Sequence, residues 1–483
     1  YKKDDATTIK IESLLTDDGK SVGTENTYEN DVLKSTVNYT YDSHGNVASV
    51  TKTVDGKTST ATFTYAYAAD GGHTVTETIG GITDADGNPC ADITTSKTYD
   101  YRGNLVSATD ANGGTTTMTY DMLNRLLSTH YPDGTSETYT YDMVNNITTM
   151  TARNGTVYKN FYDAAGRLKS TCYVDETGND AITSSYEYDG LGRISMFRRY
   201  RFDTNYTTAR YEYNCLDQIT SEKIYDKSDE LVKTTAYAYS NTSDSNSRPI
   251  VRVEQSTTGG TYAKNIRTYD YRNNLLTDTN KSGSDERTYT YTYDFLCNRL
   301  TVTNPLGKTD TTAYDYASRP ISVTNAVGDS KTYEYDESGN LISETDFKGN
   351  ATTYAYDTAA RKISVTSPLD DEQNGLTKTY YDANGNVTKT AVQSNKKGND
   401  VTFDITDYAY DCMNRVTNSA VHPTSDSTIY TQYEHDSLGN VTKQITGLTE
   451  LLTDTSVIPD GASCITNSYD IRGYLHRKSD EAT

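Results

Sequence analysis

Aromatic and polar residues alternate with a period of two along most of this chain. The triplets Tyr-Thr-Tyr (139–141), Tyr-Glu-Tyr (333–335) and Tyr-Ala-Tyr (354–356) place rings on one side of an extended backbone and Thr, Glu or Ala on the other. Thr, Tyr and Val favour pleated strands, and the clean stretches lack helical spacing. The pattern therefore predicts an all-β chain.

A Tyr-Asp pair closes these stretches at regular intervals. Tyr99, Tyr120, Tyr141 and Tyr162 follow one another every 21 residues, and a second series with this interval begins at Tyr293. A repeat of this length is typical of stacked or spiralling architectures. The predicted structural repeat residues are Tyr99, Asp100, Gly103, Tyr120, Asp121, Tyr141, Asp142, Tyr162, Asp163, Gly166, Tyr188, Asp189, Tyr293, Asp294, Tyr314, Asp315, Tyr335, Asp336, Gly339, Tyr356, Asp357, Tyr381, Asp382, Gly385, Tyr410 and Asp411.

Each repeat carries the residues of two hairpin turns. Gly or Asn stands three residues after the repeat Asp, as in Gly103, Asn124, Asn145 and Gly339, and both residue types tolerate a left-handed backbone. Asp at the first position of a type I turn caps the loop backbone, so turn chemistry explains it without catalysis. A second turn follows about ten residues later. We expect positive φ at Gly103, Gly166, Gly339 and Gly385.

The number of repeats sets the size of the sheet. About eighteen repeats with two strands each imply on the order of 36 strands, too many for an open twisted sheet or a filled barrel. The fold class predicted is a long antiparallel meander of hairpins coiled into a spiralling β-ribbon, forming a hollow shell or partial cage. The rings of Tyr120, Tyr141, Tyr335 and Tyr356 are expected to share one mostly buried face and to form a ladder of stacked rings.

Composition and charge exclude several classes of binding partner. The chain has 44 Tyr, 7 Phe and no Trp among 483 residues, and its formal charge is −22. Such an acidic surface argues against nucleic acid as a partner, and the chain has no apolar run long enough for membrane insertion. The six cysteines are widely separated, which favours free, buried thiols over a metal site.

No arrangement of residues points to catalysis. The histidines are dispersed, and no motif of a nucleophilic, phosphate-binding or zinc-dependent enzyme occurs. The segment Asp-Ala-Asp-Gly-Asn (84–88) resembles part of a calcium loop, but Pro89 and Thr95 stand where such a loop needs Gly and Glu, so an Asx-rich turn is the other reading. We predict no catalytic residue, no metal and no cofactor, and hence no enzyme.

The motifs Tyr-Asp-Ala-Ala-Gly-Arg-Leu (162–168), Tyr-Asp-Glu-Ser-Gly-Asn-Leu (335–341) and Tyr-Asp-Ala-Asn-Gly-Asn-Val (381–387) resemble YD repeats, also called RHS repeats. These occur in bacterial Rhs and wall-associated polymorphic toxins, in toxin-complex C components and in teneurins. The resemblance covers nearly the whole chain and implies a ribbon that encloses a C-terminal toxin. Such shells usually close with a Pro-x-x-x-x-Asp-Pro-like motif and an aspartate-dependent self-cleavage site, and neither is found in this sequence, so processing and toxicity do not carry over.

The resemblance and the repeat pattern together define the expected organisation. Residues 1–38 form an irregular, degenerate segment, 39–197 are YD repeats, 198–268 are degenerate repeats with longer loops, and 269–483 are YD repeats truncated at the end of a longer protein. Insertions are expected at 70–93, 394–400 and 446–462.

The expected function is a non-enzymatic shell segment of a secreted or cell-surface, wall-associated bacterial protein. Its partner would be its own C-terminal toxin or cargo domain, which is not in this chain. One alternative is an adhesin module that binds carbohydrate or cell-surface glycan through exposed rings. Another is a fibre that self-associates end to end through unpaired strand edges.

Overall fold

The computed structural model describes residues 9–54, 57–201, 205–240, 247–257, 262–336, 338–368, 374–397, 400–424 and 427–482. Within these ranges the secondary structure consists of 38 β-strands, and no helix is present. The chain comprises two compact units. Unit 1 comprises residues 1–139, 152–155 and 332–483, and unit 2 comprises residues 140–151 and 156–331.

The strands before the boundary of unit 2 are β1 (Ile9–Leu15), β2 (Val22–Glu29), β3 (Val32–Tyr41), β4 (Val47–Val54), β5 (Lys57–Tyr67), β6 (His73–Ile79), β7 (Ile93–Tyr99), β8 (Leu105–Thr109), β9 (Thr115–Tyr120) and β10 (Leu126–His130), with β11 (Ser136–Asp142) crossing the boundary. Unit 2 holds β12 (Ile147–Thr151), β13 (Val157–Tyr162), β14 (Leu168–Val174), β15 (Asp180–Tyr188), β16 (Ile194–Arg201), β17 (Asn205–Tyr213), β18 (Ile219–Tyr225), β19 (Leu231–Ser240), β20 (Ser247–Thr257), β21 (Tyr262–Asp270), β22 (Leu275–Ser282), β23 (Asp285–Tyr293), β24 (Arg299–Thr303), β25 (Thr309–Tyr314) and β26 (Pro320–Thr324).

The chain returns to unit 1 through β27 (Ser330–Tyr335), which crosses the second boundary. The strands that follow are β28 (Leu341–Thr345), β29 (Ala351–Tyr356), β30 (Lys362–Pro368), β31 (Asn374–Tyr381), β32 (Val387–Lys397), β33 (Asp400–Tyr410), β34 (Val416–Thr424), β35 (Ser427–His435), β36 (Val441–Leu448), β37 (Ser463–Tyr469) and β38 (Leu475–Ala482).

Consecutive strands pair antiparallel and form a meander. Examples are the pairings of β13 with β14, β28 with β29 and β37 with β38. The register shifts by one residue at the repeat tyrosine, for example between Thr98 and Tyr99 and between Ala355 and Tyr356. This shift is the bulge that closes a short hairpin loop containing a left-handed residue. The predicted all-β meander of hairpins is confirmed.

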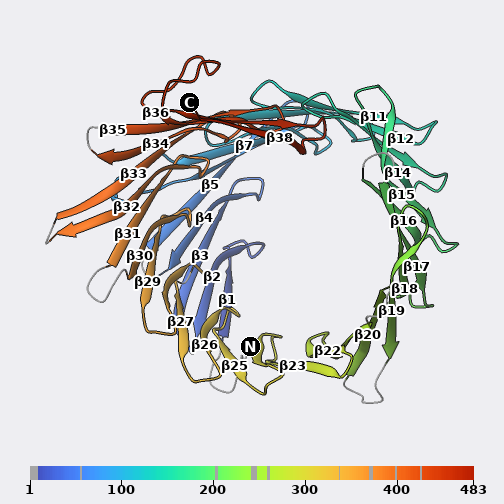
Figure 1. The fold of residues 1–483 in the computed structure, drawn as a ribbon. Helices are drawn as coiled ribbons and strands as arrows, with labels where there is room; N and C mark the ends of the chain where they lie inside the picture. The colour runs from blue at the N-terminus through green and yellow to red at the C-terminus, as the bar shows by residue number, and fades with distance from the viewer. Residues whose placement is uncertain are drawn as a thin grey trace. The chain divides into compact units, whose positions relative to one another are not determined.

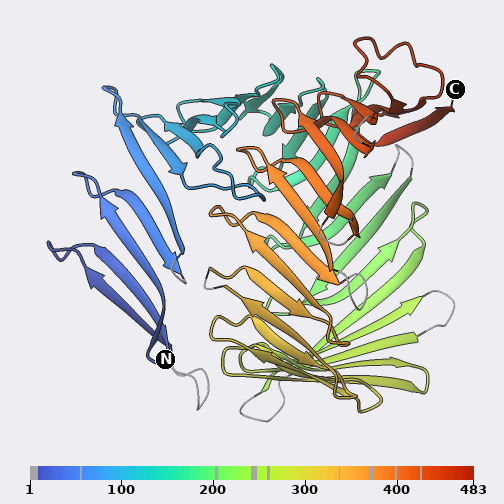
Figure 2. The ribbon, with the colours of Figure 1, turned by 90° about the vertical axis from the view of Figure 1, so that its left-hand side faces the viewer.

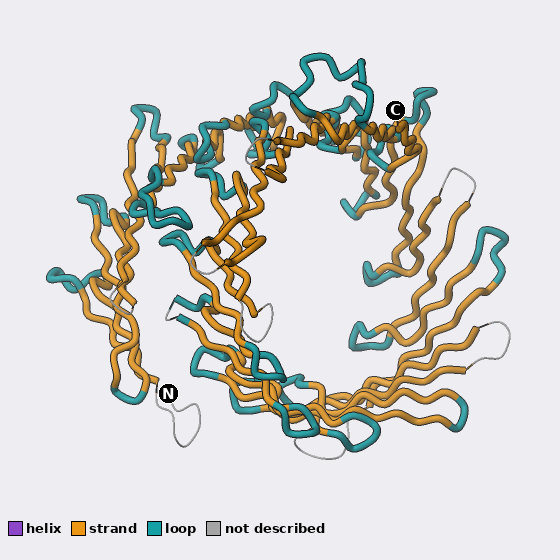
Figure 3. The backbone as a smooth tube through the Cα atoms, turned by 60° about the vertical axis from the view of Figure 1, so that its left-hand side comes forward, coloured by secondary structure: helices purple, strands orange, loops and turns teal. Residues whose placement is uncertain are grey.

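Each unit is a ribbon whose loops lie along its two edges, as Figure 3 shows in teal. In unit 2 the strands follow a curved path from β12 to β23 (Figure 1). In unit 1, loops between β6 and β9 are joined to turns between β29 and β32 by hydrogen bonds between residues 270 to 277 positions apart. Asn154, in the loop between β12 and β13, bonds to Ile471, 317 positions away. Figure 2 shows the early strands of unit 1 in blue and the late strands in orange. The ribbon therefore passes beside itself within unit 1, as expected for a spiral.

The turns adopt the predicted left-handed geometry. Gly103, Gly166, Gly339 and Gly385 have φ of 83°, 76°, 95° and 86°, which confirms the expectation for these four glycines. One position is wrong: after Asp142 the positive φ falls on Asn146 and not on Asn145. The Asp142 carboxylate there accepts bonds from the Asn145 backbone and side-chain amides, so the loop closes one residue later.

Three turns hold residues that ordinarily avoid this conformation. Cys297, Ser318 and Ala360 occupy the third position after the repeat Asp with φ of 66°, 62° and 59°. Each turn still makes the backbone bond from this residue to the Asp carbonyl, 3.0 Å long for Ala360 and Asp357. The hydrogen bonds of the loop therefore hold this position in the left-handed conformation even where the residue is not Gly or Asn.

The ribbon has little buried core. The largest fully buried side chains are Ile82, Ile445, Leu448, Thr208, Thr235 and Cys172. Ile445 and Leu448 pack with Ala462 and Cys464 beneath the insertion at 446–462, which forms a local apolar cluster. The remaining predicted insertions lie at 70–93, which is described, and at 394–400, where residues 398–399 lie outside the described residues.

Of two expectations on side-chain burial, the one on the tyrosines agrees with the structure and the one on the cysteines is wrong for four of six residues. Tyr120, Tyr141, Tyr335 and Tyr356 are mostly but not fully buried, as expected, because a ribbon one sheet thick covers their rings from one side only. The cysteines are free, but only Cys172 and Cys464 are buried; Cys90, Cys215, Cys297 and Cys412 are exposed. The four-segment division of the chain differs from the two compact units and stays a prediction.

We predict that Ala360→Gly stabilises the protein. Glycine adopts positive φ without the Cβ strain that alanine suffers, so the free energy of unfolding should rise by about 1 kcal/mol. Thermal denaturation of both proteins measures this change. Ala359→Gly, one position earlier and outside the left-handed region, is the matched control and should be neutral or destabilising. A lower melting temperature for Ala360→Gly than for the wild type would contradict the strain.

Candidate functional site: a seam between two rows of turns

The repeat aspartate organises its own loop. The Asp163 Oδ1 accepts hydrogen bonds from the backbone amides of Ala165 and Arg167, both 2.9 Å long, and its Oδ2 accepts one of 2.8 Å from the Arg167 Nε. Asp357 does the same with Ala359 and Arg361. One carboxylate thus satisfies two loop amides and fixes the side chain four residues later.

The residue four positions after the Asp is a partner that the sequence analysis missed. It is Arg in one group of repeats and Asn in another, and both donate to the carboxylate. The Arg members are Arg125, Arg167, Arg193, Arg319, Arg361 and Arg415. The Asn members are Asn46, Asn104, Asn274, Asn298, Asn340, Asn386 and Asn440. The signal was present in the motifs, where Arg or Asn follows the Gly.

Two kinds of contact connect successive repeats. The Tyr356 hydroxyl donates to the Leu341 carbonyl over 3.0 Å, and Tyr188 donates to Leu168 over 2.7 Å. The Arg361 Nη1 donates to the carbonyl of the next repeat aspartate, Asp382, over 2.7 Å. Each repeat is therefore bonded to its neighbour through main-chain carbonyls, which any sequence presents.

Guanidinium groups lie against several of the repeat tyrosines. The Arg167 guanidinium lies 4.5 Å from the centre of the Tyr188 ring, and the Arg361 guanidinium lies 5.0 Å from that of Tyr381. Such cation–π contacts are favourable by about 0.5–1 kcal/mol at exposed sites. Ring pairs among the described residues include Tyr186 with Phe197 and Tyr200 with Tyr206. In the repeats that carry Arg four residues after the Asp, a guanidinium can thus lie against a repeat ring, and the ladder of stacked repeat tyrosines stays a prediction.

Within unit 1, loops of the early strands bond to repeat turns of the late strands, and we call this line of contacts the seam. The Asn112 Nδ2 donates to the Asp382 Oδ2 over 2.8 Å, and its backbone amide donates to the Asn384 Oδ1. Further along, the Thr358 hydroxyl donates to the Gly81 carbonyl over 3.1 Å. A further contact of the seam joins the Asn154 Nδ2, which donates, to the Ile471 carbonyl over 2.7 Å. The seam is polar because hairpin turns supply its side chains.

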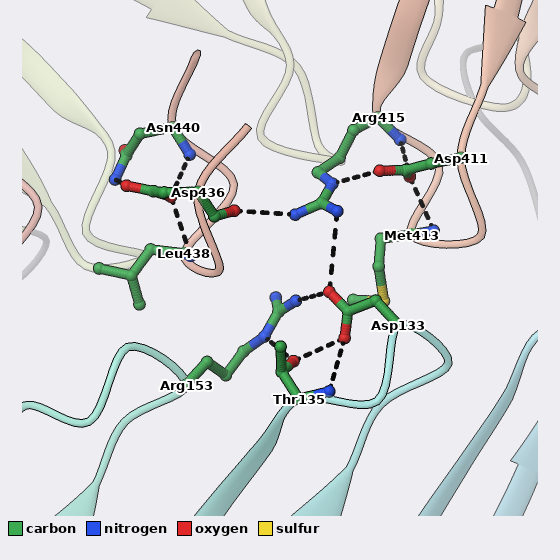
Figure 4. Close-up of polar contacts among 9 residues, drawn as sticks. All are labelled: Asp133, Thr135, Arg153, Asp411, Met413, Arg415, Asp436, Leu438 and Asn440. Carbon is green, nitrogen blue, oxygen red and sulfur yellow. Dashed lines mark hydrogen bonds and ion pairs between the residues drawn. The ribbon is translucent and has the colours of Figure 1, made fainter. Parts of the chain in front are cut away.

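Asp133 is an enclosed charge of the seam (Figure 4). Its Oδ2 lies 2.5 Å from the Arg153 Nη2 and 3.7 Å from an Nη2 of Arg415 in the opposite row. The side chains of Asp133 and Arg153 are only 13% and 12% exposed. Burial acts to raise the pKa of Asp133, but hydrogen bonds from Thr135 and the two guanidinium groups outweigh it and hold this pKa below its ordinary value.

Asp86 anchors a second charged contact of the seam. Its carboxylate accepts hydrogen bonds from the Lys378 Nζ, 2.5 Å away, and from the Tyr380 hydroxyl, 2.7 Å away. These bonds, Lys378 first, lower the pKa of Asp86. Burial, together with the bond to Asp86, raises the pKa of Tyr380 to about 12.

The loop that resembles a calcium site is an Asx turn. The Asp84 Oδ1 accepts bonds from the backbone amides of Asp86 and Asn88, and its Oδ2 accepts one from the Asn88 side chain. The Asp86 carboxylate points out of this loop and accepts a hydrogen bond from Lys378, which makes it part of the seam. In the part of the chain that the structure describes, no group of three or more His, Cys, Asp or Glu side chains is arranged to hold a metal ion.

The structure distributes the predicted repeat residues along the ribbon and brings few of them together. Asp382 contacts the opposite row directly, and Asp411 does so through Arg415, to which it bonds over 2.6 Å. The other repeat aspartates lie in separate turns, and the tyrosines end separate strands. The search for a helix long and apolar enough to cross a membrane finds none among the described residues.

Comparison with known proteins identifies the repeat. The RHS Repeat family matches residues 99–136, 123–157, 314–351 and 335–372. The chain therefore contains RHS repeats, which confirms the resemblance seen in the Tyr-Asp motifs. No curated protein sequence matches the chain significantly.

Several solved structures are similar to the chain. TcdB2-TccC3 without its hypervariable C-terminal region has a TM-score of 0.46 and 14% identity, covering 97% of this chain and 31% of that one. TcdB2-TccC3-TEV has a TM-score of 0.44 and 13% identity, covering 98% and 33%. The Photorhabdus luminescens Tc holotoxin pore has a TM-score of 0.35 and 13% identity, covering 95% and 29%. The chain spans about a third of the length of these chains.

We predict that Asp133→Asn weakens the seam. The substitution removes the charge that faces Arg153 and Arg415 but keeps the size of the side chain, so the free energy of unfolding should fall by about 2 kcal/mol. Urea denaturation measures the change. Glu212→Gln, which breaks the exposed ion pair with Lys223, is the matched control and should cost about 0.5 kcal/mol or less. Equal effects of the two substitutions would contradict the role of Asp133.

We also predict loss of stability in acid. Hydrogen bonds from the loop lower the pKa of Asp121, Asp163 and Asp411 from the ordinary 3.8, at Asp411 against the opposing effect of burial. A lowered pKa in the folded state gives stability that is complete above the unfolded-state pKa and is lost as the pH falls through the folded-state pKa. The aspartate contribution should therefore be constant above about pH 5 and decline below about pH 4. Stability that is flat to pH 2 would contradict it.

Proposed function

We propose that the chain is a non-enzymatic shell segment of a secreted or cell-surface bacterial RHS-repeat protein, which encloses or presents a toxin or cargo domain. The observation that supports this most is the seam. A ribbon that passes beside itself and is bonded row to row forms a continuous wall, whereas a free ribbon would leave both edges open to solvent. The residues along the seam have structural partners, so its role is to hold the wall together.

The geometry of the tyrosines favours the shell over glycan binding. A ring that binds sugar must offer an open face, but Tyr188, Tyr213 and Tyr381 each have a guanidinium group over one face and a hydroxyl bonded to a carbonyl. Burial raises the pKa of all three hydroxyls. These rings therefore support the ribbon and are poorly placed for stacking on a ligand.

Small-angle scattering of the purified chain tests the proposal against both alternatives. A shell segment should give a monodisperse particle of constant size, with scattering that indicates an internal solvent-filled space. A fibre would grow with protein concentration. An adhesin would bind purified cell-wall glycan in calorimetry, which we do not expect. A solid particle without internal space would overturn the shell.

A further prediction concerns catalysis. We expect no turnover of cell-wall polysaccharide, protein or nucleic-acid substrates by the purified chain, because its recurring aspartates are bonded within their own turns. We expect chelation to leave the folded state unchanged, as measured by circular dichroism. Turnover abolished by a single substitution, or unfolding on chelation, would favour an enzyme or a calcium-stabilised adhesin.

A further inference from the structure

One repeat has an imidazole where its neighbours have a phenol. His435 ends β35 and pairs with Val441, with the same register shift after Glu434 that marks the repeat tyrosines. In three other repeats the ring at this position lies under the Arg of the preceding turn: Tyr188 under Arg167, Tyr213 under Arg193 and Tyr381 under Arg361, at 4.5, 4.6 and 5.0 Å. The corresponding Arg for His435 is Arg415.

Arg415 is also one of the residues that reach across the seam. Its Nε bonds to the Asp411 Oδ2 over 2.6 Å, its Nη1 donates to the Asp436 carbonyl over 3.0 Å, and its Nη2 lies 3.7 Å from Asp133. Figure 4 shows this guanidinium between the late turns and the loop of Asp133. The repeat register thus brings a titratable ring to the Arg that holds the two rows together.

The surroundings of His435 oppose its protonation. Burial, followed by the charge of Arg415, lowers the pKa of His435 below its ordinary 6.5, although the carboxylates of Asp411 and Asp436 act in the other direction. On the neighbouring positions, Glu434 accepts a bond from the Thr455 hydroxyl, and Lys443 donates to the Thr455 carbonyl. Across the seam, Asp133 and Arg153 are bonded to each other.

We propose that His435 makes the seam sensitive to protons: when the imidazole takes up a proton from water, the imidazolium repels the Arg415 guanidinium and weakens its hold on Asp133. A neutral imidazole tolerates the guanidinium, as a phenol does. The direction of the pH effect follows from linkage. The imidazole binds a proton less readily when the seam is formed than when the seam is broken, so a fall in pH below about 6.5 favours the broken seam. The proposal depends on the seam alone and not on any cargo.

Hydrogen exchange measured by mass spectrometry at about pH 7.5 and 5.5, corrected for intrinsic exchange, tests the proposal. In the wild type, residues 131–136 and 411–416 should lose protection severalfold at the lower pH. His435→Tyr restores the repeat residue, whose phenol stays neutral in this range, and should keep both segments protected. His435→Phe serves if the tyrosine variant folds poorly, since its ring is also neutral. His476→Tyr, at an exposed histidine, is the control and should behave as the wild type.

The same experiment can overturn the proposal. Equal protection of the wild type at both pH values would show that the seam does not respond to protons. A response retained in His435→Tyr and His435→Phe would assign it to another group. Asp133→Asn adds an independent readout: it should lower protection of 131–136 already at the higher pH and leave little further loss at the lower one. Since aspartates titrate below about pH 4, their effect stays separate from that of His435.

Discussion

The carboxylate of the repeat aspartate is the interaction on which the ribbon depends. Its first oxygen satisfies two amides of the loop, and its second holds the Arg or Asn four residues later, as Asp357 holds Arg361. The fixed Arg then reaches the next repeat through the Asp382 carbonyl and the Tyr381 ring. A local turn thus determines the spacing between repeats, and an acidic chain with few aliphatic residues can fold through repeated short-range contacts.

This construction explains both the thin core and the nature of the seam. A single layer of strands covers each ring from one side, so the repeat tyrosines remain half-buried and bond their hydroxyls to carbonyls at the margin. Where the ribbon passes beside itself, it presents turns, and turns supply Asp, Asn, Arg and main-chain oxygens. Contacts such as Asp86 with Lys378 and Asp133 with Arg415 are therefore electrostatic, and their strength depends on protonation and ionic strength.

Part of the turn geometry could be predicted from residue type and part could not. Gly103 and Gly385 predict positive φ because glycine lacks a Cβ and adopts the left-handed conformation without strain. Ala360 and Ser318 give no such signal, because the hydrogen-bonded loop and not the residue selects their conformation. The surroundings of the rings show the same limit: period-two alternation shows which face a ring occupies, but it does not show that the Arg167 guanidinium lies against the Tyr188 ring.

The sequence by itself determined the strands, the hairpin turns and the spiralling class of fold, because these depend on contacts within a few residues and on a period that repeats many times. Only the tertiary structure decided which turns meet. Asp133 and Arg415 stand 282 positions apart, and their contact depends on twist and curvature accumulated over all the intervening strands. Small differences in loop length change that sum, so the register of the seam cannot be read from any single repeat.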